Sequence, residues 1–154
     1  MTDDIRIRIM EKEDYDGVRK LWLGIEGFAI RSIDDSREGV YRFLDRNPTT
    51  SIVAQKGDEI IGAILCGHDG RRGCFYHVCV EKKHRQQGIG KAMVVMAMEE
   101  LRRERINKVS LIAFTRNDVG NQFWKCIGWT RREDLNYYDF TLNEENIIRY
   151  NKEA

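Results

Sequence analysis

The chain has 154 residues, of which 42% are hydrophobic and 33% charged, and its formal net charge is +1. This length predicts one domain over residues 1–154 with its own core, and the composition is ordinary for a globular protein. The net charge near zero gives no electrostatic reason to expect binding to nucleic acid or to a membrane surface. No apolar run is long enough to span a bilayer. We therefore expect neither nucleic acid nor membrane as a partner.

The cysteines lack the spacing of a metal site or a disulfide scaffold. No C-x-x-C pair occurs, and no cysteine has a histidine at zinc-ligand spacing, so no metal is predicted. The N-terminal MTDDIRIRIM is charged and alternating, unlike an export signal. We expect a cytoplasmic protein with free thiols at Cys66, Cys74, Cys79 and Cys126.

The first half of the chain predicts a strand, two helices and a hairpin. IRIRI (5–9) alternates as a strand does, and apolar residues then recur at helical spacing from Tyr15 to Ile25. Residues 26–35 are expected to be a loop or broken helix. A second short helix is expected from about Ser36 to Asn47-Pro48. The next two strands, SIVAQ and IIGAILCG, are joined by a hairpin turn at KGDE.

The second half continues with alternating strands and helices. A glycine-bracketed turn (68–73) leads to the strand CFYHVCV (74–80), and a helix with one apolar stripe follows HRQQGIG. KVSLIAF (108–114) predicts a strand, and a helix then stops at Gly128. WTRRED and YYDFTL predict a final pair of strands, and the last dozen residues a terminal helix.

This order of elements predicts an α/β fold with a mixed sheet and helices on both faces. Two strands of the sheet, joined by a helix, lie within residues 74–114. Such a strand–helix–strand unit is expected to be parallel and right-handed.

HRQQGIG (84–90) lies between an apolar strand and a helix, and it combines glycines with local cations. Backbone N–H groups at such a turn, with the helix dipole, form an anion site. A P-loop does not fit, because Arg85 stands where its first glycine belongs and Ala92 replaces the hydroxyl residue. A dinucleotide-binding motif does not fit either, because Met93 occupies its third glycine.

R-Q-Q-G-I-G (85–90) resembles the [RQ]-x-x-G-x-[GA] motif of the GNAT superfamily of N-acetyltransferases. The resemblance continues upstream in V-C-V (78–80) and downstream in N-D-V-G-N-Q-F-W-K-C-I-G-W (117–129). It implies a central twisted mixed sheet of about seven strands that is splayed between the fourth and fifth. It also implies acetyl-CoA as cofactor.

The resemblance further implies which residues hold the cofactor. The end of the 74–80 strand would pair with the pantetheine arm as an added strand does, and the 85–91 loop would hold the phosphates. Asn117 would hydrogen-bond the pantetheine, and Trp124 would pack on the cofactor. The implied cofactor-binding residues are Val78, Cys79, Val80, Arg85, Gln86, Gln87, Gly88, Ile89, Gly90, Lys91, Asn117 and Trp124.

The catalytic residues are less defined. His77 is a candidate general base, because imidazole accepts a proton near neutrality. The family's usual acid is a tyrosine at the position of Trp124, and an indole N–H does not give up its proton. Either the thiolate leaves unassisted or another residue donates, the candidates being Tyr76, Tyr137, Tyr138 and Cys126. Ile112 replaces the glutamate base of some relatives that acetylate protein N-termini.

Strict alternation in 74–80 would place Tyr76, Val78 and Val80 on one face and Phe75, His77 and Cys79 on the other. Only one of the two faces would then line the cleft, and the sequence leaves open which one. Acidic residues of the expected acceptor loops (Glu26, Asp34, Asp35 and Asp69) could attract an amine. Arg71 and Arg72 could instead bind a carboxylate.

The leading hypothesis is an acetyl-CoA-dependent N-acetyltransferase. It would acetylate the primary amine of a small molecule, amino acid or protein by direct attack in a ternary complex. A non-catalytic CoA-binding sensor or partner protein is the alternative, favoured by Trp124. A nucleotide-binding module is a third hypothesis, against which the failed P-loop count argues. Both a monomer and a homodimer are compatible with the sequence.

Overall fold

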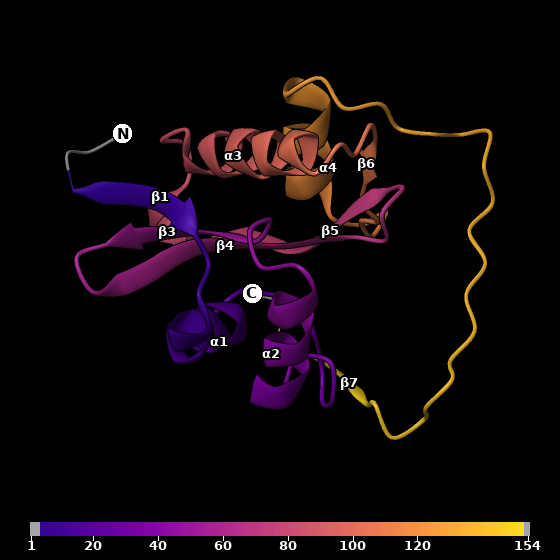
Figure 1. The fold of residues 1–154 in the computed structure, drawn as a ribbon, viewed down its shortest axis with the longest axis horizontal. Coiled ribbons are helices and arrows are strands. Elements are labelled where there is room, and N and C mark those ends of the chain that lie inside the picture. The colour runs from indigo at the N-terminus through magenta and orange to yellow at the C-terminus, as the bar shows by residue number, and fades with distance from the viewer. Residues whose placement is uncertain (1–3, 153–154) are drawn as a thin grey trace.

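A computed structural model describes residues 4–152. Its centre is a five-stranded sheet in the order β1-β3-β4-β5-β6 (Figure 1). The strands are β1 (Ile5–Ile9), β3 (Ile52–Lys56), β4 (Glu59–His68), β5 (Gly73–Val80) and β6 (Val109–Ser110). Neighbouring strands are antiparallel except β5 and β6, which are parallel. The predicted mixed sheet and the parallel strand–helix–strand unit are thus confirmed.

Helices cover both faces of this sheet, as expected (Figure 1). The helices α1 (Tyr15–Leu23) and α2 (Arg37–Arg46) lie on one face, and α3 (Ile89–Arg103) and α4 (Asp118–Cys126) lie on the other. The short 3-10 helices η1 (Lys12–Asp14) and η2 (Lys82–His84) precede α1 and α3. Each face has its own apolar core, one around Trp22 of α1 and one around Met93 of α3. Within residues 4–152, every helix is too short or too polar to cross a lipid bilayer.

Local signals in the sequence account for the element boundaries. The Ser36 side chain accepts a hydrogen bond from the Gly39 N–H and caps α2, which ends at Arg46 just before Asn47-Pro48. Helix α4 ends before Gly128, whose φ of 92° is left-handed. The β3–β4 hairpin turns through Gly57, at a φ of 58°. These boundaries confirm the sequence predictions.

The C-terminal part differs from the prediction. The predicted strand 108–114 is a strand only at Val109–Ser110, and WTRRED and YYDFTL form no strands. The predicted terminal helix is wrong: β7 (Ile148–Tyr150) pairs antiparallel with β2 (Ala29–Arg31), inside the expected loop 26–35. The backbone of β7 forms its hydrogen bonds with β2, a segment far away in the sequence. Local periodicity does not reveal such a pairing. The seven strands are therefore divided between sheets of five and two.

Residues 130–145 form an extended segment that we call the arm. It leaves the body after α4 and returns to it at β7, looping outside the rest of the chain (Figure 1). Every residue of the arm is exposed.

Candidate functional site

The sheet opens between β5 and β6. These strands pair only where Gly73 meets Val109 and Cys74 meets Ser110. Beyond Cys74, β5 continues to Val80 with β4 on one edge, and no strand within residues 4–152 lies along the other. Val78, Cys79 and Val80 lie in this stretch, so their backbone groups along the free edge can pair with an extended ligand.

A bulge in β5 interrupts the alternation of its side chains. Ala63 pairs with Cys79 and Leu65 with Tyr76, so Ile64 stands opposite two residues, and His77 has a left-handed φ of 50°. His77 therefore faces α1 and α2 together with Tyr76, rather than facing the opposite side. The prediction that these two side chains point to opposite faces is wrong, because the extra residue resets the alternation.

The bulge places His77 in a fixed environment. Its Nε2 lies 2.9 Å from Asp35 Oδ1, and its ring centroid is 4.8 Å from those of Trp22 and Phe28. The other oxygen of Asp35 accepts the Arg31 N–H at 2.6 Å. The carboxylate favours the tautomer with the proton on Nε2, which leaves the Nδ1 lone pair free to accept a proton. The His77 side chain remains 13% exposed.

The two tyrosine candidates lie in different places. Tyr76 is half exposed, with its ring edge-on to Phe43, and partial desolvation and the neighbouring Cys74 raise its pKa to about 12. Its phenol is therefore protonated at physiological pH. Tyr138 lies on the arm and is 86% exposed, and within residues 4–152 no ring contact joins it to Tyr76 or His77.

The loop before α3 exposes a row of backbone donors. Among residues 4–152, the N–H groups of residues 86–91 have no backbone acceptor, and the first such bond runs from the Ala92 N–H to the Gly88 carbonyl at 3.0 Å. Gln86 and Gly88 adopt left-handed φ angles of 62° and 78°. Consecutive free amides at the start of a 15-residue helix form an anion site.

Side chains of the same loop support this interpretation. His84 Nδ1 and Gln87 Oε1 are buried without a hydrogen-bond partner within the described residues. Buried polar atoms in this state usually bind water or a ligand. Arg85 Nε donates to the Val80 carbonyl at 2.9 Å and so ties the loop to the end of β5. A Cβ on Gly90 would lie 3.2 Å from the Phe123 ring, so α4 packs closely against the start of α3 here.

The remaining predicted residues lie nearby but differ in accessibility. Ile89 is buried in the core. The exposed Lys91 lines, together with Gly88 of the loop, a hollow beside β1. Asn117 Oδ1 accepts the Gly120 N–H at 3.0 Å and caps α4, leaving Nδ2 as a donor. Trp124 packs against Trp129, with ring centroids 4.7 Å apart, and against Phe75 of β5.

Sequence reasoning missed Asp35 as the partner of His77. It named Asp35 only as one of several loop acids that could attract an amine. The two residues are 42 positions apart, and no local signal connects them. The sequence did not predict the bulge either, because it also lacks a local signal: β5 contains no glycine between Gly73 and its end.

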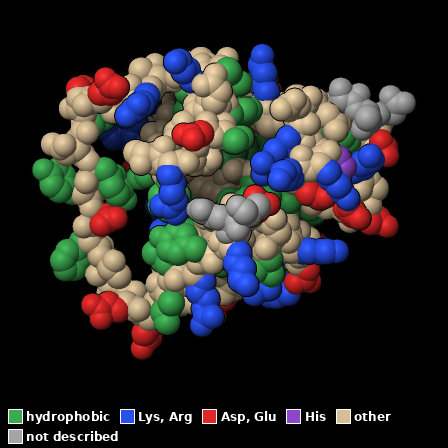
Figure 2. Space-filling view, turned by 180° about the vertical axis from the view of Figure 1, so that it is seen from behind, with side chains coloured by type: hydrophobic (Ala, Val, Ile, Leu, Met, Phe, Trp, Pro, Cys, Tyr) green, Lys and Arg blue, Asp and Glu red, His purple; other side chains and the backbone are tan. Residues whose placement is uncertain are grey.

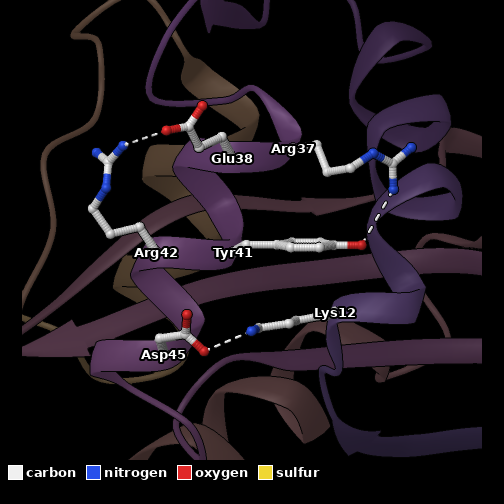
Figure 3. Close-up of a pocket in the computed structure, with 6 residues that line it drawn as sticks. All are labelled: Lys12, Arg37, Glu38, Tyr41, Arg42 and Asp45. Carbon is white, nitrogen blue, oxygen red and sulfur yellow. Dashed lines mark hydrogen bonds and ion pairs between the residues drawn. The ribbon is translucent and has the colours of Figure 1, made fainter.

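A hollow on the outer side of α2 has a different character (Figure 3). Its charged side chains are paired: Lys12 with Asp45 at 2.7 Å, Arg42 with Glu38 at 3.6 Å, and Arg37 with Asp16 at 2.5 Å. It is open to solvent, and its lining residues belong to α2 and η1 rather than to β5 or the loop before α3. We assign it no part in the site.

Comparison with known proteins identifies the family. The family model described as "Acetyltransferase (GNAT) family" matches residues 15–129. An acetyltransferase of Pectobacterium atrosepticum is 29% identical over 115 residues, which cover 75% of this chain and 80% of the relative. An acetyltransferase of Yersinia pestis is 26% identical over 144 residues, which cover 94% of this chain and 96% of the relative.

Solved structures share the fold. The PaiA N-acetyltransferase from Thermoplasma acidophilum, in complex with coenzyme A, superposes with a TM-score of 0.72 at 16% identity over 99% of both chains. The NatC complex bound to Gag peptide and CoA gives 0.68 at 22% identity, covering 85% of this chain and 87% of that chain. The free edge of β5 and the amides of residues 86–91 both lie within the residues that the family model matches. The chain therefore belongs to the acetyltransferase (GNAT) family, and acetyl-CoA is its acetyl donor.

Proposed function

We propose that this enzyme acetylates a primary amine of a small molecule, an amino acid or a peptide by direct attack of the amine within a ternary complex. The observation that carries the proposal is the His77–Asp35 pair, whose Nε2 and Oδ1 atoms lie 2.9 Å apart. His77 belongs to β5, the strand whose free edge suits the cofactor. Bound acetyl-CoA supplies the acetyl group as an activated thioester. The chain's own residues must then position the two partners and remove a proton from the amine.

Positioning depends on backbone groups. The free edge of Val78–Val80 would pair with the pantetheine amides, and Asn117 Nδ2 could add a hydrogen bond. The N–H groups of residues 86–91 would hold the pyrophosphate at the N-terminus of α3. With the pantetheine along β5 and the pyrophosphate at the start of α3, the acetyl group would lie beside the bulge in β5.

Proton removal is assigned to His77. An alkyl ammonium has a pKa of about 10, so the amine is mostly charged and unable to attack at neutral pH. Asp35 holds the Nε2 proton, so Nδ1 can accept a proton from the ammonium, directly or through water. Asp35 also stabilises the imidazolium that results, and it acts as a positioning residue.

The leaving thiol does not require a strong acid. Trp124 can donate a hydrogen bond but no proton, and the Tyr76 phenol, whose pKa is raised to about 12, stays protonated at neutral pH. An ordinary thiol has a pKa of roughly 8.5, so it can depart as a thiolate near neutral pH. Tyr76 is therefore proposed as a hydrogen-bond donor in the site rather than as a proton donor.

The acceptor side contains few free acidic groups. Asp34 accepts a hydrogen bond from Asn146 at 2.8 Å, and Asp35 is occupied by His77. Asp69 caps its own turn by accepting the Arg71 and Arg72 N–H groups. Neighbours with this fold include AAC(6')-Iy in complex with the bisubstrate analogue CoA-S-monomethyl-acetylneamine and NatC bound to a peptide. Aminoglycosides and peptides should therefore both be tested as acetyl acceptors.

The proposal is tested by incubating the protein and acetyl-CoA with polyamines, aminoglycosides, amino acids and short peptides. Release of free thiol is followed, and products are identified by mass spectrometry. We expect one class of amine to gain an acetyl group on nitrogen. Thiol release by hydrolysis alone, or binding of acetyl-CoA without transfer to any amine, would contradict the proposal.

Cofactor binding is tested separately by calorimetry. The double variant Gln86→Glu, Gln87→Glu puts two negative charges beside the proposed pyrophosphate site, and we expect acetyl-CoA to bind about 10- to 100-fold more weakly. Lys20→Glu on the exposed side of α1 changes the net charge by the same amount and is the matched control. Equal affinity in the double variant and the control would place the phosphates elsewhere.

A further inference from the structure

The loop that leads from α1 to α2 supplies two of the three side chains that enclose His77. Asp35 and Phe28 both belong to residues 24–36, and the third, Trp22, lies in the last turn of α1. Within residues 4–152, the only regular structure in this loop is β2, and β7 is the only strand beside it. A two-stranded sheet with three residue pairs is marginally stable by itself. Further contacts must therefore hold the loop in the conformation that places Asp35 against His77.

Residues 146–152, which we call the C-terminal segment, make these contacts. In the rear view of Figure 2 the arm stands apart from the body, so the segment that follows it is held by its own contacts rather than by the chain leading into it. Two asparagines, Asn146 and Asn151, reach across to the loop from either end of β7. Each bonds to backbone groups more than a hundred positions away.

Asn151 holds the α1 end of the loop. Its Nδ2 donates to the carbonyl oxygens of Trp22 and Ile25 at 2.8 and 2.7 Å. Its backbone N–H donates to the Phe28 carbonyl at 2.9 Å. The two residues whose rings pack on His77 are thus both tied to the C-terminal segment through their backbone carbonyls.

Asn146 holds the α2 end of the loop. Its Oδ1 accepts the N–H groups of Ile33 and Asp34 at 2.9 and 3.1 Å, and its Nδ2 donates to Asp34 Oδ2 at 2.8 Å. Both polar atoms of the side chain are therefore used on the two residues directly before Asp35. An amide that accepts with one atom and donates with the other fits this stretch of backbone in one orientation only.

The step from Asn146 to His77 passes through Asp35. Asp35 is 6% exposed, and its carbonyl accepts a hydrogen bond from the Tyr15 hydroxyl at 2.7 Å. Its carboxylate is shared between the Arg31 N–H, at 2.6 Å, and the His77 ring. The carboxylate reaches both partners while the chain keeps the turn in which the Asp35 N–H donates to the Arg31 carbonyl. Asn146 bonds to the middle of that turn and so fixes where the carboxylate points.

We propose that Asn146 is a positioning residue for the general base, because it holds the turn that aims the Asp35 carboxylate at His77. The inference rests on the proposed function, which gives His77 the role of the base, and it makes the C-terminal segment part of the machinery for amine acetylation. Among residues 4–152, the hydrogen bonds of the Asn146 side chain go to residues 33 and 34 and not to the loop before α3. Changing it should therefore alter the base and leave the binding of acetyl-CoA intact.

The first test exchanges donor and acceptor between positions 34 and 146. Asn146→Asp puts a second carboxylate against that of Asp34, and the repulsion should distort the turn. We expect kcat to fall by about 10- to 100-fold, since a displaced base loses its alignment, at an unchanged KM for acetyl-CoA. Asn146→Ala removes the contacts without the repulsion and should cause a smaller loss of the same kind.

The exchange is completed by the double variant Asp34→Asn, Asn146→Asp. It again pairs one donor with one acceptor, so we expect it to regain most of the kcat measured for Asp34→Asn alone, which keeps an acceptor oxygen for Asn146. Asn107→Asp, in the exposed turn before β6, adds the same charge as Asn146→Asp and is the control. A loss of kcat that Asp34→Asn does not reverse, or an unchanged kcat in Asn146→Asp, would overturn the proposal.

The second test observes the His77 ring directly and needs no acetyl transfer. Nitrogen-15 NMR of the neutral imidazole distinguishes a proton on Nε2 from one on Nδ1. We expect the proton on Nε2 in the wild type and in the double variant, and both tautomers in exchange in Asn146→Asp. An unchanged ring in Asn146→Asp refutes the positioning role. If the wild type acetylates no amine, the proposed function fails, and the ring alone decides whether Asn146 positions His77.

Discussion

The chemistry proposed for His77 depends on one extra residue in β5. In a regular strand His77 would face away from Tyr76, and the left-handed φ at the bulge turns it toward Asp35, Trp22 and Phe28 instead. Two aromatic rings hold the imidazole and a carboxylate fixes its tautomer. A histidine held in this way can act as a base without first paying the entropy of ordering its side chain.

We expect His77→Gln to lower kcat by about 10²- to 10⁴-fold, the range typical for loss of a general base. Glutamine can still hydrogen-bond Asp35, so the affinity for acetyl-CoA should change little. The loss should shrink as pH rises, because more of the amine is then already neutral. His68→Gln, at the far end of β4, is the control, and an unchanged pH profile in His77→Gln would contradict the assignment.

The cysteines differ in reactivity in a way that the structure predicts. Burial raises the pKa of Cys66 and of Cys79 to about 12, so only about one thiol in 10⁴ is ionised at pH 8. Cys126 is exposed. We expect iodoacetamide to label Cys126 in the folded protein, and Cys66 and Cys79 only after unfolding, as read by peptide mapping. Rapid labelling of Cys79 in the folded protein would contradict this prediction.

At the scale of elements, the sequence predicts what is local. Caps, turns and apolar periodicity define α1, α2, the β3–β4 hairpin and α4, because each signal lies within a few residues of the feature it sets. The pairing of β7 with β2 depends on residues more than a hundred positions apart and has no such signal. The bulge at His77 likewise arises from the register with β4, and strict alternation could not reveal it. The loop of residues 85–90 could be singled out as a candidate anion site because its motif is contiguous.

Packing can reverse the effect of a helix-favouring substitution. In isolation, alanine favours a helix over glycine by about 1 kcal/mol. A Cβ on Gly39 of α2, however, would overlap the carbonyl oxygens of Ile33 and Asp34, which belong to the backbone and cannot move aside cheaply. We expect Gly39→Ala to lower the free energy of unfolding by about 1–3 kcal/mol, measured by urea denaturation.

The matched control is Gly24→Ala at the end of α1. Its φ of −91° is compatible with alanine, and the nearest atom to a Cβ there is the Leu21 carbonyl oxygen at 3.5 Å. This substitution should stabilise the protein by about 0.4–1 kcal/mol through the unfolded chain. Effects of equal sign at the two glycines would show that the close packing of α2 against residues 33–34 is not retained in solution.

At the scale of the whole molecule, one ion pair joins the central sheet to the α1 side. Arg8 of β1 donates two hydrogen bonds to Asp14 at 2.8 and 2.7 Å, and the Glu11 N–H donates a third at 2.8 Å. Burial alone would raise the pKa of Asp14, but these hydrogen bonds outweigh it and hold the pKa below its usual range. The folded protein therefore binds this proton less readily than the unfolded chain does.

That difference sets the sign of an acid dependence. The stabilisation from Asp14 is complete well above the pKa of an unfolded aspartate, about 3.9, and is lost as pH falls through the lower value in the folded state. We expect Asp14→Asn to cost about 1–2 kcal/mol of unfolding free energy at pH 7 and progressively less toward pH 3. Asp58→Asn, in the exposed β3–β4 turn, is the control. The free energy of unfolding is measured against pH for Asp14→Asn and wild type. If the two curves remain parallel over this range, the Arg8–Asp14 pair does not couple folding to protonation.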